Sequence, residues 1–227
     1  MKLRLIAAAL ATACCATTAH AAFDLRVTEI WPGNEPGSNL TEDWFELTNY
    51  GASAWTAAVD GNLYYDDESA DSTTADLMSG VASIAAGESV VFVNGNEAGR
   101  NEWLALWAGD LASVPQVGYF NGAGLSQGGD AVAVFLDTGF DGPTTSDLLG
   151  VATYPDAEST GGQSYDLVLA AFSTVGNAAG AIATTGVNNA SQPAVGSPGS
   201  VAPVPLPAAA WLLAPALAGL VGARRRG

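Results

Sequence analysis

The sequence contains one histidine, two cysteines and one lysine, and all four lie within the first 22 residues. These residues are Lys2, Cys14, Cys15 and His20. The rest of the chain therefore has no disulfide, no cysteine nucleophile, no Ser–His–Asp triad and no Schiff-base lysine. A zinc or copper site built from histidine and cysteine is excluded as well. The side chains that remain for chemistry are carboxylates, hydroxyls, amides and aromatic rings.

Positive charge is equally scarce between the two ends of the chain. Five of the seven basic residues stand in the ends, whereas all 23 acidic residues lie in residues 23–203. This body of 181 residues has Arg26 and Arg100 as its only basic residues and a formal charge of −21. A surface so anionic is repelled by phosphate backbones, and we therefore expect no nucleic-acid partner.

The first 22 residues have the order of a secretory signal peptide. Residues 1–4 are basic, residues 5–19 are uncharged and rich in alanine, and Ala19 and Ala21 form the small-x-small pattern of a cleavage site. The uncharged run is too short to span a bilayer comfortably. We therefore expect signal peptidase to cleave before Ala22 and the body to be exported.

The last 24 residues have the features of a membrane segment. Residues 204–223 carry no charge and are followed by Arg224, Arg225 and Arg226. As a helix rising ~1.5 Å per residue, the uncharged run is ~30 Å long, which is about the thickness of a bilayer's hydrocarbon core. Arginines stay on the cytoplasmic side, so the body is expected outside the membrane. We predict a transmembrane helix with a cytoplasmic arginine anchor.

The segment opens with Val204, Pro205, Leu206, Pro207 and Ala208, and a leucine- and alanine-rich run leads to the arginines. This order resembles the VPLPA variant of PEP-CTERM sorting signals. The resemblance implies that a membrane-embedded exosortase recognises and cleaves the tail. It also implies sorting to the periplasm, the cell surface or the extracellular matrix, often alongside exopolysaccharide production.

The body itself is expected to be all-β, because glycine is frequent and long helical apolar patterns are rare. Alternating or continuous apolar runs between Gly, Asn and Asp turns predict seven strands, at residues 23–28, 44–49, 63–65, 89–93, 130–137, 148–153 and 164–168. So many short strands fit a two-sheet sandwich. Because Trp44 and Phe45 are adjacent in a strand, one is expected to face the core and the other the solvent.

Two further segments complete the predicted organisation. Residues 97–107 place several large apolar side chains on one face, which predicts a single short helix. Residues 188–203 are rich in Asn, Ser, Pro and Gly and have no periodicity, which is typical of a linker. We expect this linker to join a domain at residues 23–187 to the membrane segment at 204–227.

The strands and turns of the body, taken in order, resemble a lamin tail domain. The matching stretches are VTEI at 27–30, DWFELTNYG at 43–51, IAAGE at 84–88, LSQGGDAV at 125–132, GQS at 162–164 and SPG at 197–199. They span most of residues 25–199. The resemblance implies an immunoglobulin-like two-sheet sandwich, in a family of binding and attachment modules rather than catalysts.

Acidic residues are densest in one predicted loop. The candidate ligands there are Asp66, Asp67, Glu68, Asp71 and Asp76. Carboxylate oxygens on a flexible loop are suitable ligands for Ca²⁺, although the spacing is not that of an EF-hand. A solvated acidic surface loop is the alternative. Apart from this Ca²⁺ candidate, we expect no cofactor.

Glu29 and Glu46 lie in the two strands that best match the resemblance. They are candidates for the carboxylate pair of a glycoside hydrolase. The alternative, which we prefer, makes them outward-facing or strand-end partners of backbone amides or of Arg26 and Arg100, because the sequence gives no sign of a shaped cleft. Trp31 precedes Pro32 and Gly33 and is expected near a loop tip, where its ring could contact a sugar. Burial in a core is its alternative role.

These features together predict an exported β-sandwich without catalysis of its own. It is expected to act as a binding or display module in the envelope or the extracellular matrix. Its expected partners are signal peptidase, an exosortase-type enzyme, the membrane, and a polysaccharide or envelope protein. Two alternatives from other classes stay open. One is a carboxylate-dependent polysaccharide hydrolase, and the other is a Ca²⁺-dependent adhesin.

Overall fold

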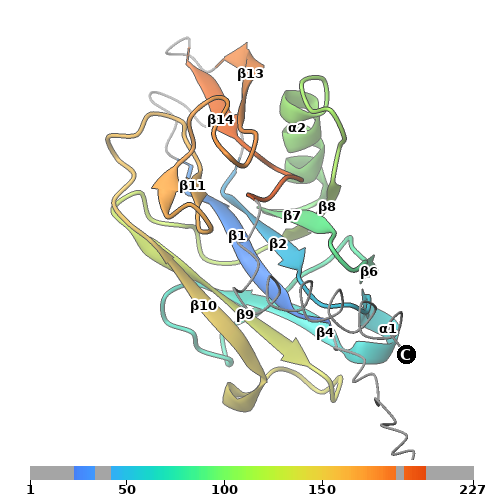
Figure 1. Cartoon of the computed structure of the whole chain (residues 1–227). Helices are drawn as coiled ribbons and strands as arrows, with labels where there is room; N and C mark the ends of the chain where they lie inside the picture. Colours follow the sequence, from blue (N-terminus) through green and yellow to red (C-terminus); the bar gives the residue numbers. More distant parts are fainter. Residues whose placement is uncertain (1–22, 34–41, 188–191, 203–227) are drawn as a thin grey trace, which may run out of the picture.

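The computed structural model describes residues 23–33, 42–187 and 192–202. The signal peptide with Ala19 and Ala21, the sorting motif at 204–208 and the terminal arginines lie outside these residues. In the described part of the chain, no helix is long and apolar enough to cross a membrane. Strands far outnumber helices among the described residues, so the all-β prediction is confirmed (Figure 1).

Every predicted strand has a counterpart, and several short strands were not predicted. The strands are β1 (Leu25–Trp31), β2 (Trp44–Asn49), β3 (Trp55–Thr56), β4 (Asn62–Asp66), β5 (Asp76–Leu77), β6 (Ser83–Ile84), β7 (Ser89–Asn94), β8 (Gln116–Phe120), β9 (Asp130–Asp137), β10 (Leu148–Tyr154), β11 (Tyr165–Asp166), β12 (Ala171–Phe172), β13 (Ile182–Val187) and β14 (Pro193–Gly196). The helices are α1 (Ala57–Asp60), α2 (Glu97–Trp107) and the short 3₁₀ turn η1 (Thr145–Asp147). The predicted helix therefore has the observed bounds of α2.

Two sheets form the body of the domain. The larger has the order β12-β11-β1-β2-β7-β8, and the smaller has the order β10-β9-β4-β5. Strands β7 and β8 are parallel, whereas the other paired strands are antiparallel. A parallel pair needs a crossover connection, and α2 supplies it between β7 and β8. Two two-stranded sheets, the β13-β14 hairpin and the β3-β6 pair, are separate from the main sheets.

The main core lies between the two sheets. Phe45, Phe92 and Phe120 of the larger sheet are fully buried together with Leu63 and Tyr65 of the smaller one. The ring centroids of Tyr65 and Phe120 are 4.0 Å apart. This aromatic contact joins the sheets and provides much of the apolar area that drives folding.

A second core covers the outer face of the larger sheet. Trp31 and Trp44 of the sheet meet Trp103 and Trp107 of α2, and all four side chains are fully buried. Trp31 and Trp44 stack with their centroids 5.9 Å apart, and the helix tryptophans meet this pair edge-on at 5.9–6.0 Å. The larger sheet is thus buried on both faces.

This second core overturns two predictions. Trp44 and Phe45 both lie inside the protein, because α2 and the β13-β14 hairpin cover the face that was expected to meet solvent. Trp31 is also fully buried, so the predicted sugar contact at a loop tip is wrong. A strand pattern reports alternation between two faces, and here both faces are packed.

The end of the domain also differs from the prediction. Residues 192–202 were expected within a linker, but they include β14 and continue as a packed segment in which Ser197 and Ala202 are buried. The folded unit therefore continues to Ala202 and does not end at residue 187. We call residues 197–202 the C-terminal strap.

Truncation of a tryptophan in the second core should destabilise the domain strongly. We expect Trp44→Ala to lower the free energy of unfolding by about 3–5 kcal/mol, because it leaves a large cavity between the sheet and α2. Val175→Ala is the control, since Val175 is 65% exposed and its truncation should stay within about 0.5 kcal/mol. Urea denaturation followed by far-ultraviolet circular dichroism measures both. Equal midpoints for the two variants would contradict the second core.

Candidate functional site

Glu29 and Glu46 lie opposite each other on β1 and β2, next to a register shift between Val27 and Glu29. Asp166 on β11 lies opposite Glu29 on the other side. Opposite residues of antiparallel strands share a face, so three carboxylates form a row across the larger sheet. The side chains of Glu29 and Glu46 are buried, with 1% and 0% of their surface exposed. We call Glu29 and Glu46 the carboxylate pair.

The carboxylate pair is bound by hydroxyl and backbone donors. Glu29 Oε1 accepts hydrogen bonds from Ser164 Oγ and from the amide of Ser197, the latter at 2.8 Å. Glu46 Oε1 accepts from Thr28 Oγ1 at 2.6 Å, and its Oε2 accepts from the amide of Gly199 at 2.6 Å. The C-terminal strap is therefore attached to both strands through the two glutamates. Backbone amides bind these carboxylates as expected, but both side chains are buried and do not face outward, and the arginines pair elsewhere.

Two glycines allow the strap to come this close. A Cβ at Gly196 would lie 3.0 Å from Glu29 Oε1 and 3.0 Å from Ser164 Oγ, so only glycine fits without a shift. Gly199 has a φ of +82°, which side chains rarely adopt, and a Cβ there would meet the Pro115 ring at 3.3 Å. The Ser-Pro-Gly sequence at 197–199 thus lets the strap turn, so that its amides point at the carboxylates.

The site brings together four of the stretches that carry the lamin-tail resemblance. Glu29, Glu46, Ser164 and the strap come from stretches that are separated by up to about 170 residues. Sequence reasoning treated these stretches separately and did not predict that they meet. One signal was present: each glutamate is two residues from a tryptophan in its own strand, so the glutamates lie on the tryptophan face. Once Trp31 and Trp44 are buried, the carboxylates are buried beside them.

Among the residues that the structure describes, no basic group neutralises the carboxylate pair. Arg26 is mostly exposed and pairs with Asp24 at 2.6 Å, and Arg100 pairs with Glu97 at 2.9 Å. These arginines are the only basic residues between residues 23 and 203. Charged carboxylates in such a place are costly, because burial removes water and no opposite charge replaces it.

The pKa values of the three acids follow from this environment. Burial raises the pKa of Glu29 to about 7, although hydrogen bonds from Ser164 and Ser197 oppose the rise. Burial, and then the charge of Glu29, raises the pKa of Glu46 to about 8. Burial also raises the pKa of Asp166, against the effect of the amides of Leu169 and Val168. Near neutral pH the carboxylate pair therefore holds at least one proton.

A raised carboxyl pKa is a feature of glycosidase acids, but those acids must reach the bond they cleave. In the described conformation the strap covers Glu29 and Glu46, and neither side chain is accessible. The amides of Ser197 and Gly199 point at the carboxylate oxygens, which suits an anion or a protonated acid and opposes a metal cation. The arrangement is that of a structural attachment point.

The predicted calcium loop is organised by its own hydrogen bonds. The buried carboxylate of Asp66 accepts from Ser69 Oγ, from the amide of Asp71 and from Thr74 Oγ1, at 2.5, 2.7 and 3.3 Å. Asp71 in turn accepts from the amide of Thr73 at 2.9 Å. Within residues 23–33, 42–187 and 192–202, no three acidic, histidine or cysteine side chains form a metal-binding group. The calcium prediction on Asp66, Asp67, Glu68, Asp71 and Asp76 gains no support from this arrangement.

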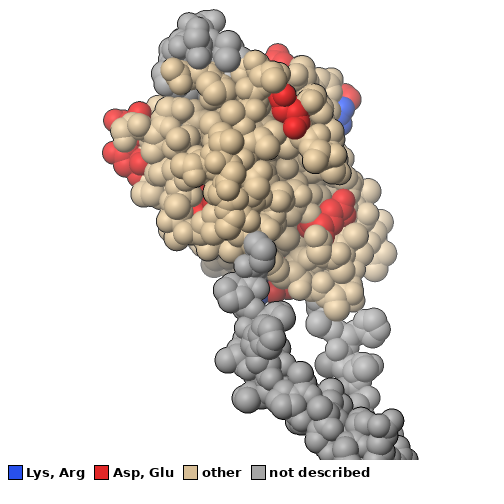
Figure 2. Space-filling view, turned by 45° about the horizontal axis from the view of Figure 1, so that its top comes forward, with Lys and Arg blue, Asp and Glu red and all other residues tan. Residues whose placement is uncertain are grey.

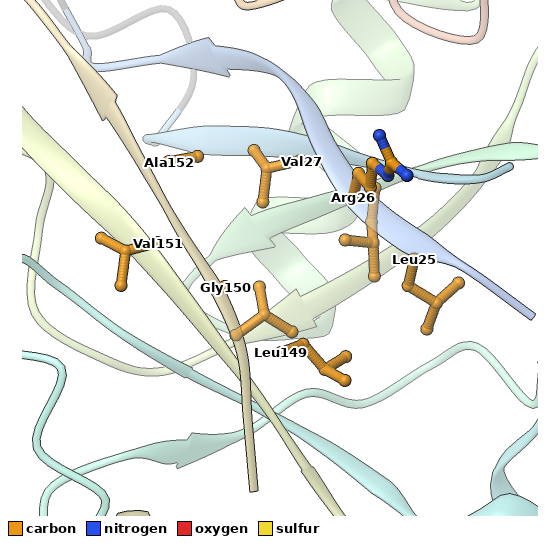
Figure 3. Close-up of a pocket in the computed structure, with 9 residues that line it drawn as sticks. Leu25, Arg26, Val27, Leu149, Gly150, Val151 and Ala152 are labelled. Carbon is orange, nitrogen blue, oxygen red and sulfur yellow. The ribbon is translucent and has the colours of Figure 1, made fainter.

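A surface pocket of about 210 Å³ lies between β1 and the edge strand β10 (Figure 3). Its lining residues are Leu25, Arg26, Val27, Leu47, Val134, Leu149, Gly150, Val151 and Ala152. Leu149 and Val151 are about half exposed. Figure 2 shows that the acidic side chains on the face in view stand in separate groups, with a large uncharged area between them.

No family model matches the chain, and no curated protein and no solved structure is similar enough to count as a match. A function proposed for this chain therefore rests on its sequence motifs and on the geometry of the carboxylate pair.

The carboxylate pair should make stability fall as the pH rises. An exposed glutamate has a pKa of about 4.5, so between about pH 4.5 and pH 8 the folded protein binds more protons at Glu29 and Glu46 than the unfolded chain does. The contribution of the pair to the free energy of unfolding is therefore largest at the acidic end of this window. It decreases as the pH rises and is lost above the folded-state pKa values.

Glu46→Gln removes one titrating group and should flatten this decline by up to about 1.4 kcal/mol per pH unit. The exposed Glu102→Gln on α2 serves as the control and should leave the decline unchanged. Urea titrations at pH 5.5, 7 and 8.5 measure the three proteins. A decline that is the same in Glu46→Gln and in the unmodified protein would exclude Glu46 as its source.

Proposed function

We propose that this protein is an exported binding or display module of the cell envelope, sorted through residues 204–227 and without catalysis of its own. The observation that carries the proposal is the place where the fold ends. The strap is attached to β1 and β2 through the carboxylate pair, and Ala202 is buried two residues before the sorting motif begins. Only residue 203 separates the packed body from the proposed sorting segment, so the two are directly connected in the chain.

The burial of the aromatic and acidic side chains agrees with a binding role. The tryptophans of the second core and the carboxylate pair, which could have served a hydrolase, all lie inside the protein. The lamin-tail resemblance adds an immunoglobulin-like sandwich from a family of attachment modules. An anionic body without thiols or disulfides also suits a protein that works outside the inner membrane.

A hydrolase acting on polysaccharide is the second candidate. It is favoured by two facing carboxylates whose pKa values are raised, since one could act as the acid and the other as the base. This function requires the strap to leave the carboxylate pair. Turnover of an exopolysaccharide fraction that is lost in both Glu29→Gln and Glu46→Gln would support this candidate over the display module.

The sorting proposal predicts two cuts in the chain. The full-length gene is expressed in a host that has an exosortase and in the same host with that enzyme deleted. Mass spectrometry of the purified protein should show an N-terminus after Ala21 in both strains. It should show a shortened C-terminal tail only where the exosortase is present.

The matched variants are Pro205→Ala with Pro207→Ala in the motif and Pro155→Ala, an exposed proline in the body. We expect the tail to stay uncut in the motif variant and to be processed in the Pro155→Ala control. Recovery of the uncut chain of residues 1–227 from the cytosol of the exosortase strain would refute the proposed function.

A further inference from the structure

The strap is attached to the larger sheet by few polar contacts. The amides of Ser197 and Gly199 donate to the carboxylate pair, at 2.8 and 2.6 Å. Ser200 Oγ donates to the carbonyl oxygen of Ala179 at 2.7 Å. Strand β14, which precedes the strap, is held differently, because it pairs with β13 and exchanges two backbone hydrogen bonds with Gly162 and Ser164. The chain can therefore open after Gly196 while β14 stays in place.

We propose that the strap is a proton-operated clasp: it stays bound while at least one glutamate of the carboxylate pair is protonated, and it detaches from residue 197 onward when both glutamates are ionised. The clasp deepens the proposed function and rests on it, because the strap is the part of the fold to which the sorting tail is joined. The carboxylate pair and the strap, which together open and close the clasp, both belong to the part of the chain that the structure describes.

The repulsion within the carboxylate pair drives the opening. The titratable groups that face the pair are Asp166 on β11 and Tyr50 at the end of β2, and neither carries positive charge. The other groups in contact are hydroxyls and amides, from Thr28, Ser164, Ser197 and Gly199. Neutral donors stabilise a single carboxylate, but they do not cancel the repulsion between two adjacent buried charges. Water reaches both charges only if the strap leaves.

The closed state favours a protonated carboxylate pair over a fully ionised one. Glu29 Oε1 already accepts hydrogen bonds from Ser164 and Ser197, whereas Glu29 Oε2 is buried and has no hydrogen-bond partner among the described residues. A carboxylate oxygen that is buried and unpaired is costly when charged. A proton on the carboxylate pair removes one of the two buried charges and so lowers this cost while the strap is closed.

Opening changes the distance between the domain and its tail. The six residues of the strap, fully extended at ~3.3–3.6 Å each, add about 20 Å of chain between β14 and residue 203. The open clasp therefore lengthens the chain that connects the sheet to the proposed sorting segment at 204–227.

Thiol protection tests the clasp. The full-length chain in detergent micelles, with Cys14→Ser and Cys15→Ser, has no other cysteine. Ala202→Cys places a thiol in the strap and Ala194→Cys places one in β14, and both parent alanines are buried. Alkylation rates are measured from pH 6 to pH 9 and divided by the rate of the same protein in urea, which removes the pH dependence of the thiol itself.

We expect the protection of the thiol in Ala202→Cys to fall about tenfold or more over this range, while the thiol in Ala194→Cys stays protected. Adding Glu46→Gln should keep the strap thiol protected at pH 9, and adding Glu102→Gln should leave the behaviour of the parent. Constant protection of the strap thiol would overturn the clasp. Loss of protection at both positions together would also overturn it, because that result reports opening of the whole domain.

Glu29→Gln provides a second neutral variant if Glu46→Gln does not fold, and the comparison of Ala202→Cys with Ala194→Cys needs neither. The assay uses purified protein, so its result is independent of tail processing. A working clasp with an uncut tail in the exosortase strain would reject only the sorting function.

Discussion

Two carboxylates face each other inside this protein without a basic side chain beside them in the described part of the chain, and much of the structure around them serves to accommodate that arrangement. Thr28 and Ser164 supply hydroxyl donors, and Ser197 and Gly199 supply amides. The energy of the pair depends on protonation, because each buried charge is costly and the second is more costly than the first. Because these groups are buried, the stability of the strap's attachment depends on the pH of the surrounding solution.

Burial of the larger sheet on both faces creates this environment. One face packs on the smaller sheet through phenylalanines, and the other packs on α2 and the β13-β14 hairpin through four tryptophans. The carboxylate pair lies on the same face of the larger sheet as the tryptophans, and the strap covers this part of the face. The strap completes the second layer, so that a segment with the composition of a linker becomes part of the core.

The sequence predicted the local elements well. Alternation located β2 and β9 at their observed bounds, and the apolar face at residues 97–107 located α2. It failed where an element depends on distant partners. The role of the strap could not be read from its Pro-, Ser- and Gly-rich composition, and β8 was missed because it is held by parallel pairing with β7 and the crossover through α2.

The sequence by itself determined the charge of the body, its lack of thiol and imidazole chemistry, the two terminal segments with the features of sorting signals, and the positions of the main strands. These properties are composition or local periodicity, which neighbouring residues encode. Only the tertiary structure decided that Trp31 is buried, that Glu29 and Glu46 form a pair, and that the strap covers them. Each of these depends on contacts between segments far apart in the chain, and a strand pattern records two faces without recording what covers them.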